Sequence, residues 1–164
     1  MEEDLLVKQY KITFLKITIF IIGLTILSLC IFLLPNLARD AAVMDPENAY
    51  LKIPVLMGLY LTAIPFFLAL YQALKILNYI KRKDAFTDLS VISLGYVRNC
   101  AMAIIVLYVI GMIMLTVLNA LHPGIALLGI VIIFASLVIA VFSAILQELL
   151  RNAIQLKSEN ELTV

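Results

Sequence analysis

The chain has 164 residues, of which 64% are hydrophobic and only 14% are charged, and its formal net charge is +1. Soluble domains carry about 25% charged residues, so this composition excludes an ordinary soluble domain and indicates a membrane protein. A net charge so close to zero gives no global basic surface, and we expect no direct contact with nucleic acid.

The first apolar run, residues 17–38, contains no charged side chain in 22 residues. A helix needs about 20 apolar residues to cross a hydrocarbon core of about 30 Å. The alternative, a cleaved signal peptide, would have an apolar region of about 7–15 residues followed by small residues. This run is longer and ends in the bulky Leu33, Leu34 and Leu37, so we predict a retained membrane helix over about residues 12–38.

The second apolar run predicts a membrane helix over about residues 53–80. Pro65 lies in the middle of this run, where it removes one backbone hydrogen bond and should kink the helix. Tyr60 and Tyr71 share one face because they are eleven residues apart, about three helical turns, and Gln72 adds an amide. Two interpretations stay open: the polar groups bond to neighbouring helices, or Tyr60, Pro65, Tyr71 and Gln72 line a ligand cavity at the kink.

The connection between the second and third apolar runs, residues 75–98, is the largest polar segment of the chain. It holds five of the 12 basic residues, and Thr87 or Asp88 can cap the next helix. We predict that the second helix continues beyond the membrane, that the chain turns near Lys83, and that the third helix begins before it enters the membrane.

The stretch from Asn99 to Gln147 contains 49 consecutive residues without Asp, Glu, Lys or Arg. The sequence His-Pro-Gly at residues 122–124 is a turn signal that divides it into two runs of 23 residues. No soluble core explains an uncharged stretch of this length. It predicts two membrane helices, about residues 88–120 and 125–156, joined by a very short turn.

Small and weakly polar residues follow one face of the fourth predicted helix. They occur in steps of seven, four, three and four residues, the spacing of one helical face: Gly129, Ser136, Ala140, Ser143 and Gln147. Such faces let helix backbones approach closely in a membrane, so we expect a packing seam here. A shorter face of the same kind on the first helix, also expected to be a seam, comprises Thr18, Thr25 and Ser28.

The tail, residues 148–164, alternates apolar and polar residues with helical periodicity. Leu149 and Leu156 are among its apolar residues, whereas Arg151 and Gln155 are polar. The pattern predicts an amphipathic helix that lies at the membrane surface or packs beneath the bundle.

Basic residues are distributed unequally between the two sides of the four predicted helices. With both termini on one side, that side holds ten Lys and Arg, and the other side holds two, Arg39 and Lys52. The side richer in Lys and Arg is cytoplasmic in membrane proteins. We therefore predict an all-α protein: a single integral membrane four-helix bundle over residues 1–164, with both termini cytoplasmic.

Three segments carry a resemblance to a known family: residues 58–75 (GLYLTAIPFFLALYQALK), 85–91 (AFTDLSV) and 156–164 (LKSENELTV). They resemble the YoaS-like bacterial membrane proteins, classed as domain of unknown function 2975. The resemblance covers nearly the whole chain and implies a multi-pass protein of the bacterial cell membrane. Members are often encoded beside a very small helix-turn-helix DNA-binding protein of the Cro/C1 type. That neighbour implies a membrane component paired with a transcription regulator.

Two functions from different classes follow. The first is a membrane regulator or sensor that docks the small helix-turn-helix protein on its cytoplasmic loop and tail. The alternative is a small membrane transporter or exporter component, although the spans contain no Asp or Glu to couple ions. We expect no enzymatic activity and no catalytic, cofactor-binding or metal-binding residues, because the spans offer no His, Asp or Glu to serve as a base or ligand.

The expected partners are the lipid bilayer, the Cro/C1-type protein and, as an open alternative, further copies of the chain in a homo-oligomer. The residues expected to form the cytoplasmic docking surface are Lys81, Arg82, Lys83, Phe86, Asp88, Lys157 and Glu159.

Overall fold

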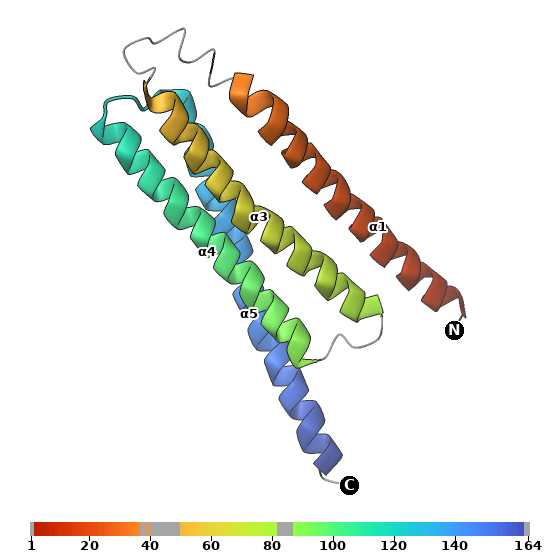
Figure 1. Ribbon diagram of the computed structural model, residues 1–164. Helices are drawn as coiled ribbons and strands as arrows, with labels where there is room; N and C mark the ends of the chain where they lie inside the picture. Colours follow the sequence, from red (N-terminus) through yellow and green to blue (C-terminus); the bar gives the residue numbers. More distant parts are fainter. Residues whose placement is uncertain (1, 37–38, 40–49, 82–86, 163–164) are drawn as a thin grey trace.

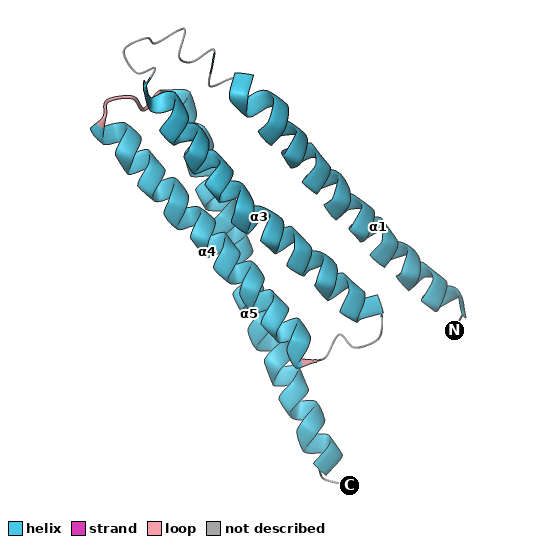
Figure 2. Cartoon of the chain, in the orientation of Figure 1, coloured by secondary structure: helices cyan, strands magenta, loops and turns pink. Residues whose placement is uncertain are grey.

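The computed structural model describes residues 2–36, 39, 50–81 and 87–162. Its four long helices are α1 (Glu2–Ser28), α3 (Lys52–Lys81), α4 (Asp88–Val117) and α5 (Pro123–Leu162), and a short π-helix, η1 (Leu29–Leu33), continues α1. The described residues form helices and short connections, without a strand (Figure 2). The prediction of an all-α bundle of four membrane helices is confirmed.

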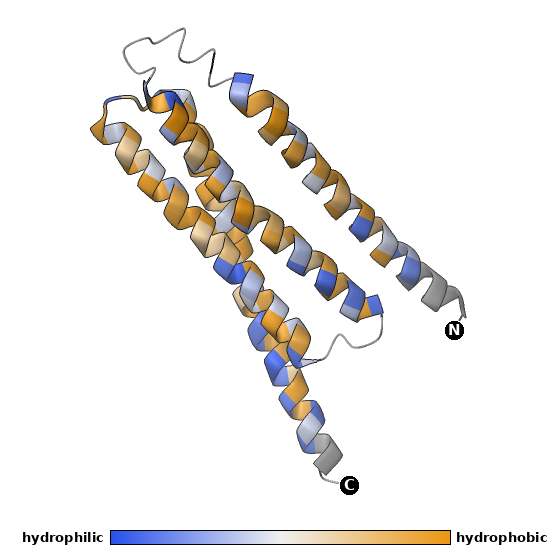
Figure 3. Cartoon of the chain, in the orientation of Figure 1, coloured by the Kyte–Doolittle hydropathy of each residue, from blue (hydrophilic) through white to orange (hydrophobic). Residues whose placement is uncertain are grey.

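All four helices are long and apolar enough to cross a membrane. Hydrophobic residues dominate their middle portions, and hydrophilic residues gather toward their ends (Figure 3). Many large apolar side chains are exposed, as Phe20, Phe134 and Phe142 are. Lipid tails can cover such side chains, so the exposed apolar surface is consistent with a protein that lies in a bilayer.

The main contacts join helices that follow one another in the chain: α1 packs on α3, α3 on α4, and α4 on α5. The helix α4 therefore has a main neighbour on each side, whereas α1 lies at the edge of the bundle (Figure 1). Both chain ends lie at the end of the bundle where α3 stops and α4 starts (Figure 1). We call this the proximal end, and the opposite end, with the turn between α4 and α5, the distal end.

The predicted seam on α5 is confirmed, because its small residues are buried against α4. Two glycines leave room for a side chain of the facing helix. A Cβ atom on Gly129 would lie 2.7 Å from Met112 Sδ, and one on Gly95 would lie 2.9 Å from Gln147 Nε2. Buried residues of the two helices include Ser90, Ser93, Ala101 and Ile104 on α4 and Ser136, Ala140 and Ser143 on α5.

The second predicted seam, on α1, is wrong. Thr18, Thr25 and Ser28 are exposed, and Thr18 Oγ1 donates to the carbonyl oxygen of Phe14 at 3.0 Å, within its own helix. This hydroxyl therefore needs no partner on another helix. The less exposed face of α1 follows steps of four and three residues: Ile12, Lys16, Ile19, Gly23, Ile26 and Cys30.

The helix α4 ends in a Schellman motif. The N–H of Ala120 donates to Leu115 O at 3.0 Å, and the N–H of Asn119 donates to Thr116 O at 3.1 Å. Asn119 itself has φ 54°, in the left-handed region where asparagine and glycine are favoured over other residues. This compact stop leaves only a short connection before Pro123 begins α5.

Replacing Asn119 with valine should lower the free energy of unfolding by about 1–2 kcal/mol, because a β-branched residue is strained at positive φ. Asn119→Gly should leave the free energy of unfolding unchanged or raise it slightly, because glycine adopts positive φ without strain. Unfolding in mixed detergent micelles measures both variants. An equal loss of stability in both would contradict a role for the left-handed conformation.

Candidate functional site

The helix α3 carries the four residues that the sequence analysis proposed as the lining of a ligand cavity: Tyr60, Pro65, Tyr71 and Gln72. The hydroxyl of Tyr60 donates a hydrogen bond to the carbonyl oxygen of Cys30 at 3.0 Å. Cys30 lies in the π-turn η1, where the regular hydrogen-bonding pattern of the helix is altered. Tyr60 therefore joins α3 to α1 in the distal half of the bundle, as the first of the two interpretations expects.

Pro65 lies within an unbroken α3 and borders an open apolar hollow of about 510 Å³ between α3 and α4. Tyr60, Tyr71 and Gln72 do not line it, so the structure does not gather the four residues around one cavity. The side chains that line the hollow are Leu61, Ile64, Pro65, Leu68, Met102, Ala103, Val106 and Leu107.

Tyr71 and Gln72 lie nearer the proximal end. Tyr71 is exposed, whereas Gln72 Oε1 is buried without a hydrogen-bond partner among the described residues. Closer to the middle of the bundle, Thr62 Oγ1 donates to the carbonyl oxygen of Leu59 at 2.7 Å, within its own helix.

The proximal end holds the described part of the expected docking surface. Lys81 is the last residue of α3 and Asp88 is the first of α4. Arg82, Lys83 and Phe86 lie outside the described residues. Lys157 and Glu159 are exposed near the end of α5, and each has a polar or electrostatic interaction.

The helix α5 extends past the rest of the bundle at this end (Figure 1). Gly95, which contacts Gln147, lies seven residues after the start of α4, so antiparallel packing brings that start level with about residue 154. The predicted tail is a direct continuation of α5, not a separate helix turned along the membrane or folded beneath the bundle. With 40 residues, α5 is about 60 Å long, roughly twice the apolar thickness of a bilayer.

A second proximal feature is a hollow of about 570 Å³ lined by Lys16, Lys75, Asn78, Tyr79 and Lys81. The ammonium group of Lys16 donates to Asn78 Oδ1, and Lys75 Nζ lies 6.0 Å from the centre of the Tyr79 ring. Sequence reasoning counted Lys16 and Lys75 only for orientation and also assigned Lys81 to the docking surface. It could not pair Lys16 with Asn78, because the two are 62 residues apart in the chain.

The described residues do not contain three His, Cys, Asp or Glu side chains close enough to share a metal ion. Cys30 and Cys100 are both free thiols. The polar groups that the structure brings together are therefore lysines, tyrosines and amides, which bind ligands by charge and hydrogen bonds.

The chain is similar to a protein family and to a bacterial membrane protein. Residues 36–164 match the family described as Protein of unknown function (DUF2975). The chain is 51% identical over 153 residues to the "Uncharacterized membrane protein YoaS" of Bacillus subtilis (strain 168), covering 92% of this chain and 96% of that relative. No solved structure matches the chain. Together with its four membrane-spanning helices, these findings confirm the resemblance: the chain is a multi-pass membrane protein that belongs to the DUF2975 family.

Proposed function

We propose that this protein is a membrane regulator that holds a small cytoplasmic helix-turn-helix protein of the Cro/C1 type at its proximal end. The observation that carries the proposal is the extension of α5 beyond the start of α4. Leu149 and Leu156, seven residues apart on one helical face, are 60% and 63% exposed; Leu156 lies in this extension, and Leu149 lies beside the first turns of α4. Polar residues surround them, including Arg151 and Gln155.

An apolar pair within a polar rim is the usual composition of a protein–protein contact. Leu149 and Leu156 follow the uncharged stretch of α5, so they lie where the chain has become polar. Lys81 and Asp88 add charged groups at the neighbouring helix ends. The partner implied by the family resemblance is small, in keeping with a docking surface made of one projecting helix and two helix ends.

The orientation that this role requires has independent support. The proximal helix ends carry Lys16, Lys75, Lys81, Arg98 and Arg151, whereas Lys52 begins α3 at the distal end. Membrane proteins place the end rich in Lys and Arg in the cytoplasm. The role is one of binding, without catalysis, and the partner supplies the contact with DNA.

The experiment is co-purification from membranes of the small helix-turn-helix protein encoded beside the gene. Truncation after Arg151 should leave membrane insertion intact, because the four apolar stretches all precede this residue. It should release the partner to the cytosol. Leu156→Glu in the full chain should reduce partner retention at least about tenfold, because burial of one leucine contributes about 1.5–3 kcal/mol.

The matched control is Gln155→Glu, which adds the same charge at the neighbouring exposed position of the same helix. It should retain the partner. Equal retention by the full chain, the truncated chain and Leu156→Glu would rule out docking on α5. Absence of the partner from membranes that contain the full chain would also rule out docking on α5.

A further inference from the structure

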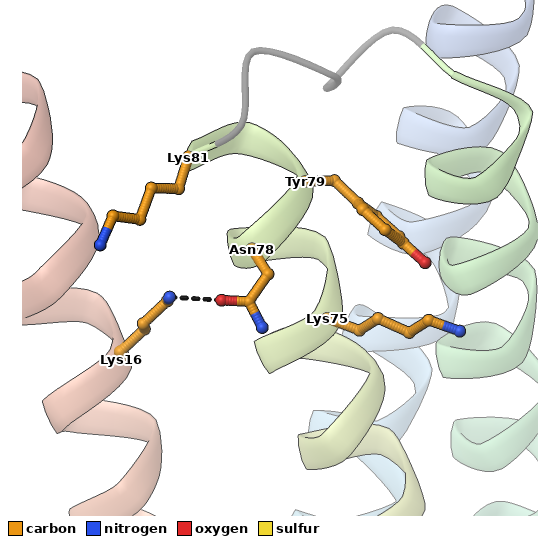
Figure 4. A pocket seen from close by; sticks show the side chains of 5 residues that line it. All are labelled: Lys16, Lys75, Asn78, Tyr79 and Lys81. Carbon is orange, nitrogen blue, oxygen red and sulfur yellow. Dashed lines mark hydrogen bonds between the residues drawn. The ribbon is translucent and has the colours of Figure 1, made fainter.

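The hollow of about 570 Å³ at the proximal end places two positively charged lysine side chains on facing helices. Lys16 on α1 and Lys81 on α3 both point into the gap between the two helices, and Asn78 on α3 accepts a hydrogen bond from Lys16 (Figure 4). Lys75 and Tyr79 border the same hollow from the side of α3 that faces away from α1 (Figure 4). The described part of the lining thus contains three ammonium groups, an amide and a phenol, all of which can donate hydrogen bonds.

Among the residues that the structure describes, the lining includes no carboxylate to balance these charges. Lys16 donates to the neutral Asn78 amide, and Lys75 lies near the ring of Tyr79, so neither of these contacts neutralises an ammonium charge. Like charges on facing helices repel, and this repulsion grows where the dielectric constant falls toward the bilayer. An anion in the hollow would convert the repulsion into attraction.

The hollow lies at a defined depth. The uncharged run of α1 begins directly after Lys16, and the uncharged run of α3 ends directly before Lys75. The two lysines therefore mark the boundary between the hydrocarbon core and the headgroup layer on their helices. Next to them on α1, Leu15 and Ile17 are exposed toward the surroundings of the bundle. A phospholipid with its tails against these side chains would carry its phosphate at the level of the hollow.

We propose that this hollow is a binding site for a phosphate-ester anion, with the headgroup of an anionic phospholipid as its ligand. Lys16 and Lys81 bind the phosphate from the two facing helices, and the Asn78 amide nitrogen can add a further donor. Such a ligand joins α1 to α3 at the proximal end, as the Tyr60 hydroxyl does in the distal half. The proposed docking surface for a regulator shares Lys81 with this site, but lipid binding does not require the regulator.

The probe is phosphatidylglycerol in equimolar mixture with phosphatidylcholine, in nanodiscs that contain the full chain. Native mass spectrometry counts the lipids that stay bound after release from the disc. The double variant Lys16→Gln/Lys81→Gln should lose most of the retained phosphatidylglycerol, because each surface lysine contributes a factor of about five. The control Lys11→Gln/Arg151→Gln removes the same charge from exposed positions of α1 and α5 outside the hollow. This control variant should retain as much phosphatidylglycerol, relative to phosphatidylcholine, as the wild-type protein.

A second variant separates binding from folding. Asn78→Asp gives Lys16 a carboxylate partner, so the contact between α1 and α3 is kept or strengthened, but the anion now meets a negative charge. We expect a melting temperature no lower than that of the wild-type protein, together with loss of the bound phosphatidylglycerol. A purely structural role for the lysines would leave lipid retention unchanged in this variant.

Inorganic phosphate, added to the protein in neutral detergent, tests whether the hollow binds a free phosphate instead of the phosphate of a lipid headgroup. Loss of phosphatidylglycerol in Lys16→Gln/Lys81→Gln but not in the control assigns the site to a lipid headgroup. Thermal stabilisation by inorganic phosphate that this variant abolishes, with lipid retention unchanged, assigns it to a free phosphate. If neither probe depends on Lys16 and Lys81, the proposed site does not exist.

Discussion

Replacing Ala140 with leucine is expected to disrupt the packing of α4 against α5 and to lower the free energy of unfolding by about 1–3 kcal/mol. Ala140 is only 4% exposed and lies on the buried face of α5 with Ser136 and Ser143. In a membrane, helices associate through close packing, and a larger side chain at such a position separates the two backbones. The fraction of monodisperse protein after extraction and its melting temperature both measure the loss.

Ile139→Leu is the matched control, because Ile139 is the preceding residue and is 49% exposed. This change conserves volume on a surface that lipid can cover, so yield and melting temperature should stay close to those of the wild-type protein. Equal tolerance of the two substitutions would mean that the buried face of α5 is not closely packed.

Reporter fusions, which show whether a position of the chain lies inside or outside the cell, are expected to give all-or-none signals at four positions. Fusions after Pro46 and after Pro123 should report outside, and fusions after Lys83 and at Val164 should report inside. The reason is the distribution of ten basic residues on one side of the bundle and two on the other. An alkaline phosphatase and a fluorescent protein at each site give opposite signals, so each position is tested twice.

A signal from outside at Lys83 would overturn the orientation and with it the proposed cytoplasmic docking surface. The four positions are coupled, because an even number of spans requires Lys83 and Val164 to agree. Disagreement between these two sites would instead mean that α4 or α5 does not cross the membrane.

The helices could be predicted from the sequence because charged residues are excluded from the hydrocarbon core. Which face of each helix meets its neighbour was harder to predict. Membrane helices are apolar on almost every side, so the contrast that marks the inner face of a soluble helix is lost. Small residues revealed the face of α5, but on α1 bulky isoleucines such as Ile12 and Ile19 lie on the less exposed face, and the threonines bond within their own helix.

The polar contacts depended on information that a single sequence does not contain. The bond from Tyr60 to Cys30 and the bond from Lys16 to Asn78 require the register of α1 against α3. No side-chain pattern in either helix sets that register by itself. The sequence therefore identified Tyr60 as a polar group that needs a partner, but it could not name the partner.

The order of the helix contacts has a consequence for how the protein is made. Each helix after the first contacts the helix synthesised just before it: α3 contacts α1, α4 contacts α3, and α5 contacts α4. During membrane insertion, a newly released helix therefore finds a neighbour already in place, and α3 and α4 gain their larger contact when the next helix arrives. Contacts between nearby segments form quickly, so the nascent chain spends little time with an unpaired polar face in the lipid.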